Sequence, residues 1–204
     1  MIVCLVTDRA RIDPVEQSAR AATAGIDLIQ VRERDLDAKP LARLVMRVLE
    51  AVRGSRTRVV VNDRLDVALA CGAHGVHLRA DSIAASAART IVPRGFLIGR
   101  SVHSVADATE AATGSDYLIA GTVFQTPSKP GSAPLLGIDG LNAIAGTATV
   151  PVLAIGGVTA GRLDEIARSG AAGIAGIGLF CSDEGLGSIT QQARLRFDSL
   201  KPGS

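Results

Sequence analysis

Short apolar runs alternate along the whole chain with longer stretches in which apolar residues recur at helical spacing. Eight runs have the length and the Val, Ile and Leu content of buried strands, and they span residues 2–7, 28–32, 59–62, 75–78, 97–101, 117–121, 152–156 and 173–177. A helical pattern follows each run, and these patterns predict helices over residues 14–24, 41–52, 65–70, 84–91, 105–112, 138–145, 162–168 and 188–200.

The order of these elements predicts the fold. Strict alternation of strand and helix requires a parallel sheet, and eight units of about 25 residues match a closed (β/α)8 barrel. We therefore predict an α/β protein with a single TIM-barrel domain over residues 1–204; the alternative, a doubly wound open sheet, needs no eighth unit. A glycine also ends the helix before every second strand, at Gly25, Gly72, Gly114 and Gly170, where we expect the left-handed conformation that turns a chain out of a helix.

The composition is that of a soluble protein with an aliphatic core. Apolar residues make up 47% of the chain and aromatic residues only 2%, so aliphatic residues and alanine must fill the interior. The 22 basic and 20 acidic residues nearly balance, which predicts neither a nucleic-acid partner nor an anionic membrane partner. Widely spaced Cys4, Cys71 and Cys181, the lack of a signal peptide, and the lack of an apolar run near ~20 residues predict a cytoplasmic protein.

The last two predicted strands both run into glycine. The first is followed by Gly156 and Gly157, and the second leads into Ile177 and Gly178. Neighbouring parallel strands that end in glycine leave backbone N–H groups directed at one spot, which is how barrel proteins bind a phosphate. We therefore predict an anion site formed by Gly157, Ile177 and Gly178.

Polar residues occupy inward positions near the end of the second predicted strand. Side chains in a strand alternate between two faces, so Gln30 and Arg32 should face the barrel interior, with Arg34 just past the strand end. An inward arginine is costly unless it meets an anion or a carboxylate. We interpret Arg32 as an anion ligand; the alternative is an internal ion pair with Asp63 or Glu33.

The third strand carries Asn62 and Asp63 to the same end of the barrel. An inward amide is suited to orienting a heterocycle, and a carboxylate beside it is suited to holding Mg²⁺. The alternative for Asp63 is to cap the helix that starts near Leu65, and the two roles are compatible.

The fifth strand ends with a serine and two further polar side chains. Ser101 is a candidate donor to a phosphate, which Arg100 or His103 would assist, although a structural role at the rim is favoured for His103. His77, on the fourth strand, is more typical of a hydrogen-bonded interior histidine than of a catalytic one.

The longest irregular segment spans residues 125–136 and follows the sixth strand. Thr126, Ser128 and Lys129 place two hydroxyls and an ammonium group within four residues. This combination suits a pyrophosphate, which offers several acceptor oxygens and more than one negative charge. The alternative is a solvated polar loop.

Together these stretches resemble the thiamine phosphate synthase/TenI superfamily. The similarity covers nearly the whole chain and is carried by Q-V-R-E-R, V-N-D-R-L-D-V-A-L-A-C-G-A-H-G-V-H-L, I-G-R-S-V-H-S, D-Y-L-I-A-G-T-V-F-Q-T-P-S-K and A-I-G-G-V. The resemblance implies a transferase of thiamine biosynthesis that couples hydroxymethylpyrimidine pyrophosphate to thiazole phosphate and releases pyrophosphate. Its partners would be these phosphorylated small molecules.

The resemblance also implies roles for individual residues. The pyrophosphate and pyrimidine site corresponds to Gln30, Arg32, Arg34, Asn62, Ser101, Thr126, Ser128 and Lys129, of which Arg32, Ser101 and Lys129 would act in catalysis. The thiazole phosphate would bind at Gly157, Ile177 and Gly178, and Asp63 would hold the Mg²⁺ cofactor.

The stretch after the fourth strand departs from the family pattern. Synthases of the superfamily carry G-Q-E-D there, and the last Asp is the second Mg²⁺ ligand. This chain has Arg79, Ala80, Asp81 and Ser82, so Ser82 stands at the position of the second metal ligand and Arg79 would place a fixed cation nearby.

Two other readings of the resemblance stay open. TenI-type thiazole tautomerases share V-R-E-R and I-G-R-S-V-H-S, but they use a histidine after the glycine of strand six, where this chain has Thr122. Arg34 and Gly178 also replace a lysine and a serine of the synthases. The alternatives are therefore a thiazole tautomerase, or a non-catalytic binder of thiamine-related phosphates.

Overall fold

The structure, a computed structural model, describes residues 1–126, 134–181 and 185–200. Its parallel strands are β1 Ile2–Val6, β2 Leu28–Val31, β3 Arg58–Asn62, β4 Gly75–Leu78, β5 Leu97–Val102, β6 Tyr117–Ala120, β7 Val152–Ala154 and β8 Gly173–Gly176. Its α-helices are α1 Pro14–Thr23, α2 Ala38–Ala51, α3 Leu65–Ala70, α4 Ala85–Arg89, α5 Val105–Ala112, α6 Gly137–Thr147, α7 Leu163–Arg168 and α8 Gly185–Ser199. Short 3₁₀ turns precede α7 and follow β8, at η1 Ala160–Arg162 and η2 Gly178–Phe180.

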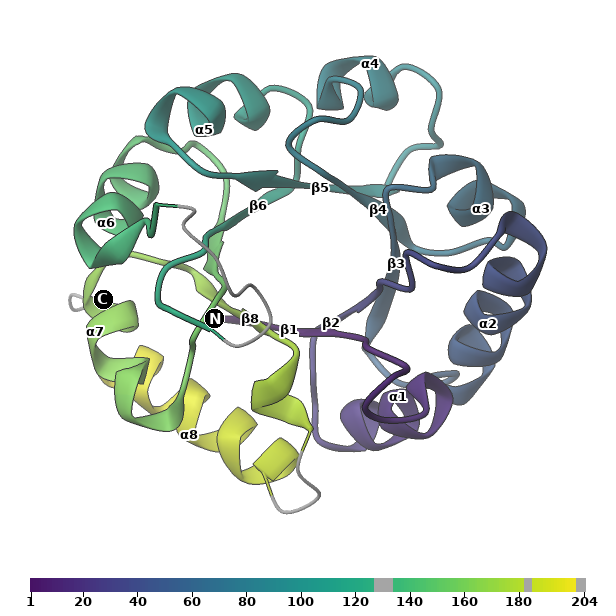
Figure 1. The fold of residues 1–204 in the computed structure, drawn as a ribbon, viewed down its shortest axis with the longest axis horizontal. Helices are drawn as coiled ribbons and strands as arrows, with labels where there is room; N and C mark the ends of the chain where they lie inside the picture. Colours follow the sequence, from purple (N-terminus) through teal and green to yellow (C-terminus); the bar gives the residue numbers. More distant parts are fainter. Residues whose placement is uncertain (127–133, 182–184, 201–204) are drawn as a thin grey trace.

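The sheet closes on itself. Each strand pairs in parallel with the next, and β8 pairs with β1 through Ile2 opposite Gly173 and Leu5 opposite Gly176. In Figure 1 the strands form an inner ring and the helices an outer ring around it. The predicted TIM barrel is confirmed, and the open sheet is excluded because the first and last strands share hydrogen bonds.

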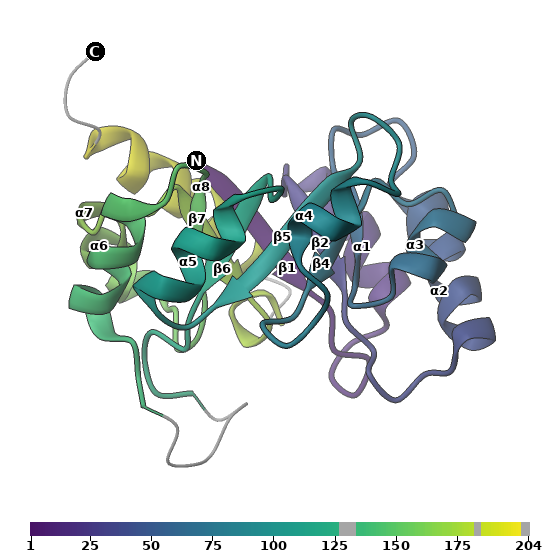
Figure 2. The ribbon, with the colours of Figure 1, turned by 90° about the horizontal axis from the view of Figure 1, so that it is seen from above.

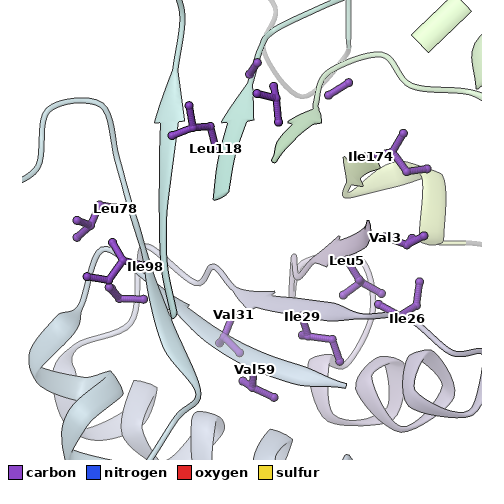
Figure 3. Packing of buried hydrophobic residues seen from close by; sticks show 14 of the residues in the cluster. Val3, Leu5, Ile26, Ile29, Val31, Val59, Leu78, Ile98, Leu118 and Ile174 are labelled. Atoms are coloured by element: carbon purple, nitrogen blue, oxygen red, sulfur yellow. The ribbon is translucent and has the colours of Figure 1, made fainter. Parts of the chain in front are cut away.

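Two apolar layers hold the barrel together. Outward-facing residues pack against the helices, and Figure 3 shows part of this layer around Val3, Leu5, Ile29, Val31, Val59 and Ile98. A smaller cluster fills the lumen; it includes Cys4, Val6, Leu28, Val60, Tyr117, Ile119, Leu153 and Ala175. Successive side chains in each strand face opposite ways, which produces both layers. A polar residue between the outward-facing ones therefore points into the lumen.

The loops that follow the strands gather at one end of the barrel. Figure 2 shows them on the lower side, opposite the N-terminus, and we call this end the mouth. Gly25, Gly72, Gly114 and Gly170 have φ values of 74°, 67°, 90° and 81°, as predicted for the turns at the opposite end. No helix in the described ranges combines the length and the apolar character that a membrane span requires.

Several element boundaries differ from the predicted ones. Helix α2 begins at Ala38 because Pro40 fits the first turn of a helix, where its missing N–H costs nothing. Helix α6 extends from Gly137 to Thr147 and is longer at both ends than predicted. Helix α8 extends from Gly185 to Ser199 and begins earlier than predicted. The turn η2 directly after β8 was not predicted at all.

Candidate active site at the mouth of the barrel

A cavity of about 630 Å³ opens at the mouth. Every strand contributes to it, either directly or through the loop that follows the strand. The inward apolar residues Val6, Ile119, Ile155 and Ala175 line its base. The cavity has the size of a site for a small organic molecule and lies where TIM barrels bind their substrates.

The predicted substrate residues come together in this cavity. Those in its described lining are Gln30, Arg32, Arg34, Asn62, Ser101, Thr126, Gly157, Ile177 and Gly178. Ser128 and Lys129 lie outside the described residues, so their predicted roles stay predictions. Asp63 and Ser82 are at the rim but are not part of the described lining.

Arginines outnumber acidic residues in the lining of the cavity, although three of them are paired with carboxylates: Arg11 with Asp8, Arg79 with Asp63 and Asp81, and Arg162 with Glu165. Among the described residues that line the cavity, Arg11, Arg32, Arg34, Arg79 and Arg162 are cationic, and Asp8 is the acidic one. Guanidinium groups bind phosphates through paired N–H donors. This cavity is therefore suited to a ligand with several negative charges, although the charge of the whole chain is nearly balanced.

Arg32 is half-buried in the cavity without a carboxylate partner among the described residues. Burial lowers the pKa of its guanidinium, and the neighbouring charge of Arg34 lowers it further. The alternative of an internal ion pair is not found in the described part: Glu33 accepts hydrogen bonds from the Thr7 hydroxyl and the Arg9 backbone N–H instead. A desolvated cation beside another cation favours binding of an anion.

Gln30 and Asn62 are joined across neighbouring strands. The Nε2 atom of Gln30 donates to Oδ1 of Asn62 at 2.9 Å. Gln30 is buried, Asn62 is half-buried and both line the cavity, so the hydrogen bond restrains the two amide groups there. Fixed amide groups of this kind suit recognition of the donor and acceptor edge of a heterocycle.

Ser101 belongs to a hydrogen-bonded chain that leads into the barrel. The Nε2 atom of His77 lies 2.9 Å from the Ser101 hydroxyl, and its Nδ1 atom lies 3.2 Å from the Tyr117 hydroxyl. Burial raises the pKa of Tyr117 and lowers that of His77 to about 3, with Arg100 and Arg32 adding to the effect on His77. The predicted interior role of His77 is confirmed, because the neutral ring is buried and bonded on both nitrogens.

We expect acid to destabilise the protein through His77. The unfolded chain takes up a proton near pH 6.5, whereas the folded protein does so only near pH 3. The free energy of unfolding should therefore fall as the pH drops through this window, by up to about 1.4 kcal/mol per pH unit from this group. Urea titrations at pH 7 and pH 5 should show a shallower decline in His77→Asn, and equal declines in the two proteins would contradict the assignment.

The backbone after β7 and β8 forms the second polar part of the cavity. Gly156 and Gly157 have φ values of 98° and 64°, a conformation that side-chain-bearing residues rarely adopt. A Cβ on Gly157 would come within 2.6 Å of the Gln125 carbonyl oxygen. In the described part, the backbone N–H groups of Gly157 and Gly178 donate no hydrogen bond to another protein group. They are thus available to a ligand at the predicted phosphate site.

Asp63 lies at the rim in an unusual backbone conformation. Its φ of 59° is the one positive value among the described non-glycine residues. Its carboxylate accepts hydrogen bonds from the Ser82 hydroxyl and, at 3.4 Å, from the backbone N–H of Arg79. The alternative role as a helix cap is not found, because α3 follows Arg64 without a side-chain cap.

Arg100 lies on the opposite side of the sheet from Ser101. The prediction that Arg100 assists in binding a phosphate is therefore wrong. Arg100 faces outward and its guanidinium donates to the carbonyl oxygens of Ala80 at 2.9 Å and of Ser82 at 3.2 Å, and also to Ile83. The residue therefore holds the loop after β4 in place.

Other lining residues were missed by the sequence reasoning. Arg11 lies in the loop after β1, and Arg162 lies in η1 with its guanidinium 3.9 Å from the ring centre of Phe124. Each follows a barrel strand by several residues, and strand parity no longer predicts direction at that distance. The sequence signal for these two residues was weaker, because it consisted only of a basic residue in a loop that follows a strand.

A profile described as thiamine monophosphate synthase matches residues 3–180 of this chain. The chain belongs to the thiamine monophosphate synthase family. The expected membership in the thiamine phosphate synthase/TenI superfamily is confirmed. The match extends from β1 to η2 and therefore contains all the described residues that line the cavity.

Individual relatives of the family agree with this result. The chain is 40% identical over 195 residues to the thiamine-phosphate synthase of Methanoculleus marisnigri, covering 95% of this chain and 87% of the relative. It is 38% identical over 181 residues to the thiamine-phosphate synthase of Roseiflexus castenholzii, covering 85% and 78%. The solved thiamine phosphate pyrophosphorylase of Pyrococcus furiosus superposes with a TM-score of 0.86 at 31% identity, covering 98% of this chain and 96% of that one.

Proposed function

We propose that this protein is a thiamine-phosphate synthase that joins hydroxymethylpyrimidine pyrophosphate to thiazole phosphate. The observation that carries the proposal is that the cavity at the mouth contains two separate groups of anion donors. Arg32 and Arg34 lie after β2, whereas the backbone N–H groups of Gly157 and Gly178, which have no acceptor among the described residues, lie after β7 and β8. Two substrates that each carry a phosphate-type anion require this division.

The reaction proceeds by dissociation. The bond between the methylene carbon of the pyrimidine and the pyrophosphate oxygen breaks, and its electron pair leaves with pyrophosphate. The thiazole nitrogen then donates its lone pair to the carbon, forming the C–N bond of thiamine phosphate. Arg32, Arg34 and Lys129 stabilise the negative charge that develops on the departing group.

The remaining residues position the two rings. The Gln30–Asn62 pair orients the pyrimidine, and the backbone N–H groups of Gly157 and Gly178 bind the thiazole phosphate. The Tyr117 phenol donates a hydrogen bond to Nδ1 of His77, which leaves the ring proton on Nε2. The Ser101 hydroxyl then accepts a hydrogen bond from Nε2 and donates one to pyrophosphate. Holding both substrates in contact removes most of the entropic part of the barrier.

The resemblance implies Mg²⁺ as a cofactor, which would neutralise part of the charge on pyrophosphate. The residues of this chain fit such an ion poorly. The Asp63 carboxylate is engaged by Ser82 and Arg79, and the hydroxyl of Ser82 is a weaker ligand than a second carboxylate. No group of three or more His, Cys, Asp or Glu residues is placed to bind a metal among those described. We therefore assign no step to the metal, and its binding at Asp63 and Ser82 stays a prediction.

A thiazole tautomerase is less compatible with the cavity. Moving a proton on carbon needs an acid–base group that titrates near neutral pH. Thr122 lines the cavity where the tautomerases carry their histidine, and His77 has a pKa of about 3. The other lining histidine of the described part, His103, has its Nδ1 atom bonded to the carbonyl oxygen of Gly121, so Nε2 is the nitrogen that a tautomerase would have to use.

Incubation of the purified protein with both phosphorylated substrates tests the proposal. We expect thiamine phosphate and pyrophosphate in equal amounts, measured by chromatography, and no product when either substrate is omitted. Isomerisation of the thiazole carboxylate phosphate without coupling would instead establish a tautomerase. Saturable binding of both substrates without any turnover would establish a non-catalytic binder.

The same proposal places the enzyme in the cytoplasm. The three cysteines are free, which is the state of thiols in a reducing compartment.

A further inference from the structure

Arg79 is a cation in the lining of the cavity, and neither strand periodicity nor the expected reaction gives it a role. It is the first residue after β4, lines the cavity, and keeps 45% of its side chain exposed. Its charge also contributes to lowering the pKa of Arg32, so the two guanidinium groups act on the same space. Both arginines line the cavity, so a ligand bound at Arg32 lies close to Arg79 as well.

Two carboxylates hold the guanidinium group of Arg79. Its Nη1 atom lies 3.6 Å from Oδ2 of Asp63, and its Nη2 atom donates to Asp81. Both Asp63 oxygens are engaged, since Oδ1 accepts from Ser82 and from the Arg79 backbone. The guanidinium thus pairs with both acids, and it engages the carboxylates that a divalent cation would need as ligands.

The loop that carries these groups is fixed from outside the barrel. Arg100 donates to the carbonyl oxygens of Ala80 and Ser82, at 2.9 Å and 3.2 Å, and to that of Ile83. Asp63 is tied to β4 as well, because its backbone N–H donates to the carbonyl oxygen of His77 at 2.9 Å. These contacts restrain the loop that carries Arg79 and Asp81, and they also restrain Asp63.

Resting on the proposed function, we infer that Arg79 binds the pyrophosphate group and supplies a fixed positive charge in place of part of the charge that a metal ion would supply. Asp63 and Asp81 orient the guanidinium and do not hold a cation of their own. A guanidinium carries five N–H donors, so those that Asp63 and Asp81 do not engage can bind phosphate oxygens. Pyrophosphate then binds, and departs from the substrate, with little need for Mg²⁺.

Calorimetric titration with inorganic pyrophosphate tests this inference without requiring turnover. In the unmodified protein we expect dissociation constants in Mg²⁺ and in excess chelator that agree within about tenfold. Arg79→Gln should weaken binding in chelator by about 10- to 100-fold, the loss of one charge-assisted pair. Binding that vanishes in chelator, or that is unchanged in Arg79→Gln, would overturn the inference.

The matched control is Arg64→Gln. Arg64 is the second residue after β3 and Arg79 the first after β4, and Arg64 pairs with Asp66 two residues later as Arg79 pairs with Asp81. It does not belong to the described lining of the cavity, so its removal should leave pyrophosphate binding unchanged. A loss in Arg64→Gln equal to that in Arg79→Gln would show a nonspecific charge effect and overturn the inference.

A second variant asks whether the guanidinium occupies a cation position. Arg79→Gln combined with Ser82→Asp leaves three carboxylates around that position, and we expect it to bind Mn²⁺, detected by electron paramagnetic resonance, at least tenfold more tightly than the unmodified protein. Equal Mn²⁺ affinity would contradict the inference. Failure of the proposed synthase reaction is distinguishable, because it would abolish coupling with or without metal and leave these binding results unaffected.

Discussion

Replacing Arg32 by methionine is expected to lower the rate of coupling by about 10²- to 10³-fold, the usual cost of losing one donor to a developing negative charge. Arg32 is half-buried in the cavity and makes no ion pair within the described residues. Its burial beside Arg34 lowers its pKa, which means that the folded protein bears a cost for keeping this charge. The melting temperature of Arg32→Met should therefore be unchanged or slightly higher.

Steady-state kinetics and thermal unfolding of the same preparations check this prediction. The control is Arg58→Met, because Arg58 is an exposed arginine at the start of β3, at the opposite end of the barrel. It should retain full activity. An Arg32→Met enzyme with normal turnover, or one that loses activity only because it unfolds, would remove Arg32 from the pyrophosphate site.

The second large effect is expected from a negative charge at Gly178. An added Cβ at this residue meets no atom within 4 Å, and its φ lies outside the left-handed region. Aspartate is therefore tolerated sterically, but its carboxylate would lie near the bound thiazole phosphate. Repulsion between charges about 5 Å apart near a protein surface costs about 1–3 kcal/mol, so the KM for thiazole phosphate should rise about 10- to 100-fold.

Gly178→Asn provides the neutral control of the same shape. Its KM for thiazole phosphate should stay within about threefold of the original value, while the KM for the pyrimidine substrate should be unaffected in both variants. Equal effects of Asn and Asp would indicate steric blocking. An effect on the pyrimidine substrate alone would place the second phosphate elsewhere.

The barrel was predictable because its strands are short, aliphatic and regularly spaced. In β1, β2 and β3 the apolar residues at alternate positions pack under the helices, and the residues between them face the lumen, as period two requires. The turn η2 was not predictable in the same way. Gly178, Leu179 and Phe180 carry no helical period, and the turn forms because Phe180 packs into the outer layer.

The site was predictable where residues belong to strands. Strand parity predicted that Gln30 and Arg32 face the cavity, and both line it. The same parity applied to the fifth strand would have directed Arg100 outward, away from the phosphate. Arg11 and Arg162 were missed because they reach the cavity from loops, where direction depends on tertiary contacts such as that between Arg162 and Phe124.

A crystal structure with thiamine phosphate and pyrophosphate bound together tests the central claim, that one cavity holds two separate anions. The account predicts the phosphate of thiamine phosphate at the backbone N–H groups of Gly157 and Gly178, and pyrophosphate in contact with Arg32 and Arg79. Either anion bound outside the mouth of the barrel, or both anions bound by the same donors, would contradict it.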